Sequence, residues 1–180
     1  MMWRQAGHWN REYWDECEKW IHWDFHTHED TDEMWKNYVY QSLLAFAAVT
    51  AVLWLLYREN AVVVASIGAT AFIVFTMPRL PTAQPRRIIG GHIIGLVSGS
   101  LAALVPHSAE LTTILIYALA VGVSIFLMVS LDMEHPPAAA TALGLVINGY
   151  LTKVVLAVLT SAVILSIAHR TMRKYLRDLV

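Results

Sequence analysis

The residues best suited to chemistry lie in one short stretch, DMEHPPAAATALGLVIN, where acidic residues and a histidine precede two prolines. In chain order these residues are Asp132, Glu134, His135, Pro136 and Pro137. Proline suits the first turn of a helix, because its missing N–H would have no partner inside the helix. The stretch therefore predicts a helix N-terminus beside which two carboxylates and an imidazole gather.

The helix that follows is short for a membrane. Ala138 to Tyr150 are 13 residues, which at about 1.5 Å per residue reach roughly 20 Å, against about 30 Å for a hydrocarbon core. We expect half a membrane span here, either crossing or re-entrant.

Such a helix start could hold a small anion. The N–H groups of Ala138 to Thr141, the hydroxyls of Thr141 and Thr70, and His135 are candidate donors. Asp132 and Glu134 would repel an anion. They fit better as partners that hold His135 or Arg86, or as a proton site that couples anion movement to a proton gradient. A solvated turn is an equally good interpretation of both carboxylates.

Composition places these residues in a membrane protein. The 180 residues are 57% hydrophobic and 15% charged, and the net charge of -1 argues against nucleic acid as a partner. Cys17 alone cannot form an internal disulfide. No cleavable signal is visible, so we expect the first membrane helix to direct insertion. With no nucleophile beside a base, no phosphate loop and no convincing metal cluster, neither an enzyme nor a cofactor is expected.

Residues 1–37 form a tryptophan-rich, acidic arm that is too polar to span a membrane. We expect an amphipathic helix at the bilayer interface, and docking onto another subunit is the alternative. His22 and His26 lie one helical turn apart and could bind a divalent metal, but a solvated histidine-rich face is favoured. We therefore predict no metal site.

Residues 38–169 are predicted to form an all-α, polytopic membrane domain, followed by a basic cytoplasmic tail, 170–180. Five full spans and one short helix are expected at 38–57, 61–77, 88–105, 111–131, 138–150 and 152–168. The proline-rich stretch 78–87 is expected to interrupt the helices. With both termini in the cytoplasm, only Arg58 and Lys153 of the 13 Lys and Arg residues lie outside.

The second and fifth segments share a weak pattern. Gly68 to Phe72 matches Ala139 to Leu143 at an offset of 71 residues, which indicates a 3+3 inverted repeat. Runs of small residues also match by chance, so a true repeat and a chance resemblance are equally good interpretations. If it is real, Gly68 and Thr70 lie opposite the start of the fifth segment, where transporters bind substrate.

The third segment carries His92 among glycines that allow neighbouring backbones to approach. His92 is interpreted as part of a pathway, with a hydrogen-bonded structural role as the alternative. Arg86 is a candidate for an anion vestibule, or else a determinant of topology.

Three ordered motifs, SIGATAFIVF, LPTAQPRRIIGGH and HPPAAATAL, strongly resemble the HPP family of integral membrane proteins over residues 38–168. Members in cyanobacteria and plastids are implicated in nitrite transport, so the resemblance implies a carrier or channel for a small inorganic anion. Ala139 and Arg87 depart from the usual family pattern and leave the substrate open. The expected substrate-binding residues are His135, Pro136, Pro137, Thr141, Thr70, Gly68, His92 and Arg86, with Asp132 and Glu134 in coupling or gating.

The sequence thus predicts a transporter or channel for a small anion, most simply nitrite, in a bacterial inner membrane. The alternative is a membrane-embedded binding or sensing module whose N-terminal arm engages a partner. The expected partners are the anion and the lipid bilayer, and a homo-oligomer is left open.

Overall fold

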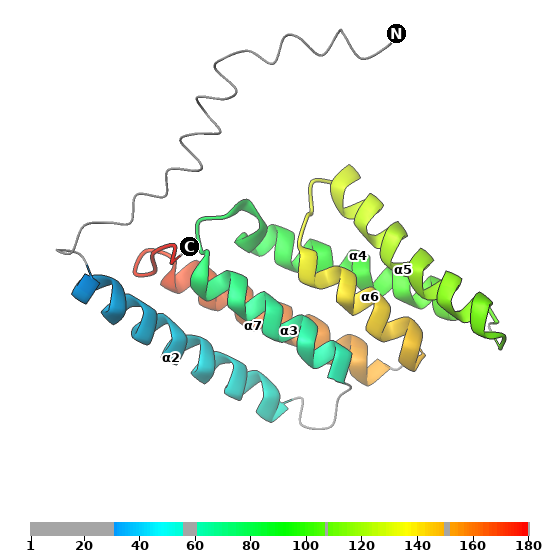
Figure 1. The fold of residues 1–180 in the computed structure, drawn as a ribbon, viewed down its shortest axis with the longest axis horizontal. Helices are drawn as coiled ribbons and strands as arrows, with labels where there is room; N and C mark the ends of the chain where they lie inside the picture. Colours follow the sequence, from blue (N-terminus) through cyan, green and yellow to red (C-terminus); the bar gives the residue numbers. More distant parts are fainter. Residues whose placement is uncertain (1–30, 56–60, 107, 150–151, 180) are drawn as a thin grey trace, which may run out of the picture. The chain divides into compact units, whose positions relative to one another are not determined.

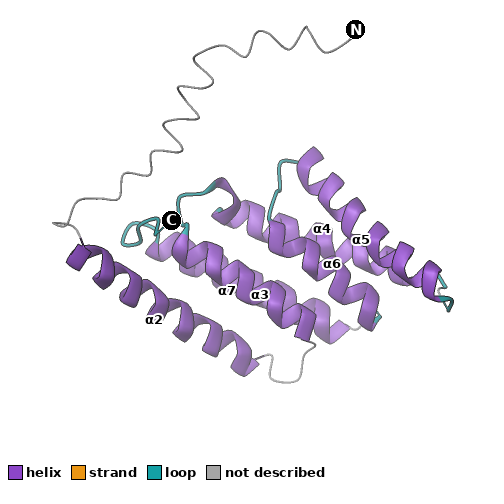
Figure 2. Ribbon diagram, in the orientation of Figure 1, coloured by secondary structure: helices purple, strands orange, loops and turns teal. Residues whose placement is uncertain are grey.

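The computed structural model describes residues 31–55, 61–106, 108–149 and 152–179, and the described part is helical without any strand (Figure 2). In chain order the helices are α2 (Thr31–Leu55), α3 (Ala61–Thr76), the 3-10 turn η1 (Pro81–Ala83), α4 (Pro85–Ala103), α5 (Glu110–Ser130), α6 (Pro136–Asn148) and α7 (Thr152–Met172). The prediction of an all-α fold is confirmed for the described residues.

Several helix boundaries differ from the sequence prediction: α2 begins at Thr31 rather than at residue 38, and α6 spans Pro136–Asn148 rather than 138–150. The difference at residues 78–87 is the most informative. The stretch 78–87 was predicted to contain no helix, but η1 forms at Pro81 and α4 begins at Pro85. Proline disrupts a helix interior, yet it fits the first helical position, so Pro85 starts α4 rather than delaying it. Arg86 and Arg87 consequently lie on the first turn of a helix.

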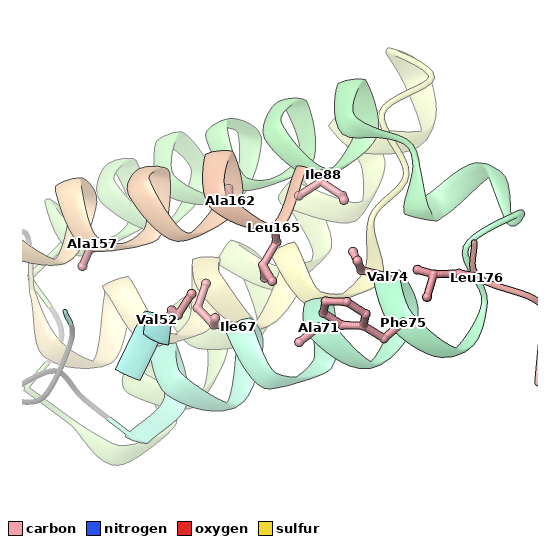
Figure 3. Close-up of a cluster of buried hydrophobic side chains, with 10 residues drawn as sticks. All are labelled: Val52, Ile67, Ala71, Val74, Phe75, Ile88, Ala157, Ala162, Leu165 and Leu176. Atoms are coloured by element: carbon pink, nitrogen blue, oxygen red, sulfur yellow. The ribbon is translucent and has the colours of Figure 1, made fainter. Parts of the chain in front are cut away.

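Residues 1–35 and 36–180 are two separate units, and the second contains the packed helices. Within it, α4 packs against α5, α6 and α7, and α3 packs against α6 and α7 (Figure 1). Figure 3 shows the largest apolar cluster of this unit. Its members are Val52, Ile67, Ala71, Val74, Phe75, Ile88, Ala157, Ala162, Leu165 and Leu176.

Glycines bring α4 and α6 into backbone contact. Gly91, Gly95 and Gly99 are spaced four residues apart and so lie on one face of α4. A Cβ at Gly95 would overlap the carbonyl oxygen of Ala138, and one at Gly99 would lie 2.5 Å from that of Ala142. The close approach expected from the glycine-rich third segment is therefore present, and its partner is the short helix α6.

The outer faces of the helices are apolar. On α5 the exposed large side chains include Leu111, Ile114, Leu115, Leu119, Phe126 and Val129. Two described helices, α5 and α7, are long and apolar enough to cross a bilayer, and α3 and α6 are shorter apolar helices. Such faces are suited to acyl chains. The number of crossings, predicted as six, stays a prediction.

The C-terminal tail packs against the α3–η1 connection. Leu176 is buried, and the Leu179 amide donates to the carbonyl of Thr76 over 2.8 Å. The Gln41 side chain of α2 donates to the carbonyls of Phe75 and Arg177, at 2.9 and 2.8 Å. These bonds join α2 and the tail after α7 to the C-terminal end of α3.

Candidate functional site

Five buried polar side chains meet where α3, α4 and the start of α6 converge. Ser66 and Thr70 come from α3, His92 from α4, and His135 and Thr141 from the beginning of α6, and each side chain is at most 1% exposed. Ser66 and Thr70 are four residues apart and therefore share one face of α3. We call these five residues the polar cluster.

His92 lies between two threonines. Its Nε2 is 3.1 Å from Thr70 Oγ1, and its Nδ1 is 2.9 Å from Thr141 Oγ1. These are the two threonines that the 71-residue offset pairs in the sequence. The contacts are those that two related halves would make around a central residue, while the inverted repeat itself stays a prediction.

Ser66 was missed by the sequence analysis. Its hydroxyl donates to the carbonyl of Pro137 over 2.6 Å and lies 2.8 Å from Thr141 Oγ1. Within the run SIGATA, Ser66 looks like another small packing residue. The available signal was its position one helical turn before Thr70.

His135 is fixed from two sides. Its Nδ1–H donates to the carbonyl of Thr82 in η1 over 2.9 Å, and its Nε2 is 3.0 Å from Thr70 Oγ1. The His92 and His135 ring centroids are 5.2 Å apart, with an angle of 60° between the ring planes. Thr70 Oγ1 is thus in contact with both imidazoles.

The start of α6 does not offer the backbone donors that the sequence suggested. Pro136 and Pro137 have no N–H, and the Ala138 N–H donates to the carbonyl of His135 over 2.9 Å. Amides further along the helix bond to carbonyls four residues back. The expectation of free N–H groups from Ala138 to Thr141 is therefore wrong, and donors for a ligand must come from side chains.

The two carboxylates bind arginines. Arg87 pairs with both Asp132 and Glu134, and Arg86 lies 3.5 Å from Asp132. Arg86 and Asp132 are largely exposed, whereas the Arg87 side chain is only 18% exposed. The sequence offered His135 or Arg86 as partners of the carboxylates. In the structure Arg86 lies near Asp132 alone, whereas Arg87 pairs with both carboxylates.

Not every predicted residue lies in the polar cluster. A Cβ at Gly68 would meet nothing within 4 Å, so this residue faces open space. Pro136 instead borders a cavity of about 300 Å³ between α5 and α6. The cavity walls are Ile125, Met128, Val129, Glu134, His135, Pro136 and Ala139. His135 therefore stands between an apolar cavity and the polar cluster.

Among the described residues, no three His, Cys, Asp or Glu side chains are grouped to hold a metal. His22 and His26 lie outside the described residues, as do residues 56–60 and His107.

Apolar helices with lipid-compatible faces around a buried polar cluster define an integral membrane protein. The family model for the HPP transmembrane region matches residues 30–177, and the chain belongs to the HPP transmembrane family. The suspected resemblance is thereby confirmed.

Two curated relatives are transmembrane proteins of Dictyostelium discoideum. One is 39% identical over 108 residues, which are 56% of this chain and 37% of the relative. The other is 39% identical over 88 residues, which are 48% of this chain and 28% of the relative. The chain thus matches about a third of the length of these relatives. No solved structure is significantly similar to it.

Proposed function

We propose that this protein is a membrane transporter or channel for a small inorganic anion, with nitrite as the first candidate. The observation that carries the proposal is the polar cluster at the meeting point of α3, α4 and α6. Polar and ionisable groups are costly inside a membrane and usually mark pathways or binding sites. Here α3, α4 and α6 each contribute polar side chains to the same buried cluster.

The chemistry of the cluster suits a small anion. Hydroxyl and protonated imidazole groups donate hydrogen bonds, and the cavity of about 300 Å³ beside His135 is larger than a small inorganic ion. Arg86 and Arg87 lie near the same end of α6 as His135, and their charge is balanced by Asp132 and Glu134. Such a balance favours passage, because an ion must bind well enough to enter and weakly enough to leave.

Substitutions in the polar cluster test the proposal. His135→Ala removes an imidazole, and Thr141→Val removes a hydroxyl at nearly constant volume. We expect each to weaken nitrite uptake into proteoliposomes, because a hydrogen bond to a charged group contributes about 1.5–3 kcal/mol, or roughly ten- to a hundred-fold in affinity. Nitrate, formate and chloride are compared in the same assay.

Matched controls lie in α7. His169→Gln changes a buried histidine that bonds the Pro78 carbonyl, and Thr171→Val changes an exposed threonine. Both controls should transport like the wild type. Unchanged uptake in His135→Ala and Thr141→Val would place the pathway elsewhere. No uptake of any of the four anions by the wild type would favour the binding or sensing module.

A further inference from the structure

The polar cluster contains fewer hydrogen-bonding protons than its contacts need. The Ser66 hydroxyl must donate to the Pro137 carbonyl, because a carbonyl oxygen only accepts. Thr141 must then donate its single hydroxyl proton to Ser66. His92 Nδ1, which is 2.9 Å from Thr141 Oγ1, must therefore carry a proton and donate it. A neutral His92 consequently has no proton on Nε2.

His135 reaches the same state by a shorter route. Its Nδ1 faces the Thr82 carbonyl and must carry a proton. A neutral His135 therefore also has no proton on Nε2. Both bare nitrogens face the same oxygen, Thr70 Oγ1, at 3.1 and 3.0 Å.

The shortage of hydrogen-bonding protons is greatest around Thr70. Its one hydroxyl proton is shared among three acceptors: the Ser66 carbonyl at 3.0 Å and the two imidazole nitrogens. With both rings neutral, at least one nitrogen lone pair faces an oxygen lone pair in a fully buried place, which is unfavourable. One added proton removes this conflict, because the charged ring donates to Thr70 and Thr70 donates to the other ring. The Ser66 carbonyl keeps its bond within the helix.

We propose that His92 and His135, bridged by Thr70, form a proton-binding site that takes up one proton together with each transported anion. This inference rests on the proposed function and adds that the proton is the ion coupled to anion transport. The sequence had considered Asp132 and Glu134 for that role, but both carboxylates are bound to arginines.

The charges around the histidines explain why proton and anion should bind together. α3 contributes only the hydroxyls of Ser66 and Thr70, and α5 contributes apolar side chains. Among the described residues, the elements packed around the pair carry the charged or titratable groups Arg86 and Arg87 of α4, Asp132 and Glu134 before α6, and His169 of α7. The arginines and carboxylates neutralise one another, so no fixed charge is left to balance a buried imidazolium.

A buried, unbalanced charge is unfavourable, and an incoming anion removes that cost. The anion in turn is attracted by the positive charge of the imidazolium, whereas the neutral histidines present only bare Nε2 lone pairs. Each ligand therefore raises the affinity for the other by the same factor. One proton with one monovalent anion moves no net charge.

Proton uptake can be measured directly on the purified full-length protein in nanodiscs. Nitrite is titrated by calorimetry at one pH in two buffers of different ionisation enthalpy, and the difference in heat gives the number of protons bound per nitrite. We expect about one. The nitrite affinity should also rise about tenfold for each unit by which the pH is lowered, while the free pair is neutral.

Variants separate the proton site from its surroundings. His135→Gln and His92→Gln each remove one of the two ring nitrogens that face Thr70, so no lone-pair conflict is left for a proton to relieve and the number should fall to zero. Thr70→Val should lower the number, whereas Thr70→Ser should keep it. The control His169→Gln should keep the wild-type number. Thermal unfolding identifies any variant that has not folded, and the four variants keep the test decisive if one of them fails.

The coupling and the function fail in different ways. Nitrite flux into proteoliposomes with no proton taken up on binding, and with an affinity independent of pH, would overturn the proton site and leave the anion transporter standing. Neither flux nor binding of nitrite, nitrate, formate or chloride would overturn the proposed function itself.

Discussion

Ser66 of α3 holds the first turn of α6 in place by hydrogen bonds. Its hydroxyl bonds the Pro137 carbonyl and contacts Thr141, so one small side chain positions two residues of α6. Thr141 in turn holds His92. The geometry of the polar cluster thus depends on a residue that would bind an anion only indirectly.

A pair of serines tests this role. Ser66→Ala leaves Thr141 without an acceptor for its hydroxyl proton, and we expect it to lower the free energy of unfolding by about 1–3 kcal/mol. Ser98→Ala is the control, because Ser98 is equally buried and its hydroxyl has no partner in the structure. Unfolding by denaturant in detergent micelles measures both. Equal losses in the two variants would show that packing, rather than the hydrogen bond, decides the result.

The sequence predicts four of the five residues of the polar cluster. Thr70, His92, His135 and Thr141 are conspicuous because histidine and hydroxyl groups stand out in apolar segments. The sequence does not single out Ser66, because serine is also a common small residue in packed membrane helices. Gly68, predicted from the repeat pattern, faces open space because it lies on another face of α3 from Thr70.

Two helices that touch through their backbones set the position of the polar cluster. α4 approaches α6 through Gly95 and Gly99, which places His92 beside the first turns of α6. The contact leaves no room for a side chain. A change in the distance between α4 and α6 would separate His92 from Thr141.

Two glycine substitutions should therefore have opposite effects. Gly95→Ala places a methyl group against the Ala138 carbonyl and should destabilise the protein. Gly122→Ala, in α5, meets nothing within 4 Å and should be neutral or stabilising, because alanine favours a helix by about 1 kcal/mol over glycine. Thermal unfolding of both variants gives the sign of each change. A stable Gly95→Ala protein with normal nitrite uptake would contradict the close contact.

Prolines show how far helix boundaries follow from sequence. The two adjacent prolines after a polar turn were predicted to lie in the first turn of a helix, and α6 does begin at Pro136, two residues before the predicted segment 138–150. The start of α4 at Pro85 was missed, because three prolines between residues 78 and 87 resemble a long interruption. A proline breaks a helix that is already formed but can occupy the first position of a new one. The local sequence does not show which of the two applies.

For the whole unit 36–180, the tail and the α3–η1 connection lie at one end. The His169 side chain donates to the Pro78 carbonyl over 2.8 Å, and the Arg79 amide donates to Asp178 over 3.0 Å. Whichever side of the membrane the C-terminus faces, the α3–η1 connection faces it too. The basic residues of both segments favour the cytoplasm.

Cysteine labelling tests this orientation. In a Cys17→Ala background, Gln84→Cys and Ser108→Cys place thiols at exposed positions before α4 and before α5. We expect an impermeant maleimide to label Ser108→Cys in intact cells and to label Gln84→Cys only after lysis. Labelling of Gln84→Cys from outside would reverse the orientation. Labelling of both would mean that α4 does not separate the two sides.

The packing of the tail also dictates an order of events during synthesis. Gln41 bonds the Arg177 carbonyl across 136 residues of chain, and Leu176 fills a place in the main apolar cluster. Because the ribosome releases a chain from its N-terminus onward, every described helix is made before residues 176–179 emerge. The contacts of this tail with α2 and α3 therefore form only after α7 has been synthesised. A nascent chain whose helices are already inserted still lacks the Gln41–Arg177 hydrogen bond and the packing of Leu176.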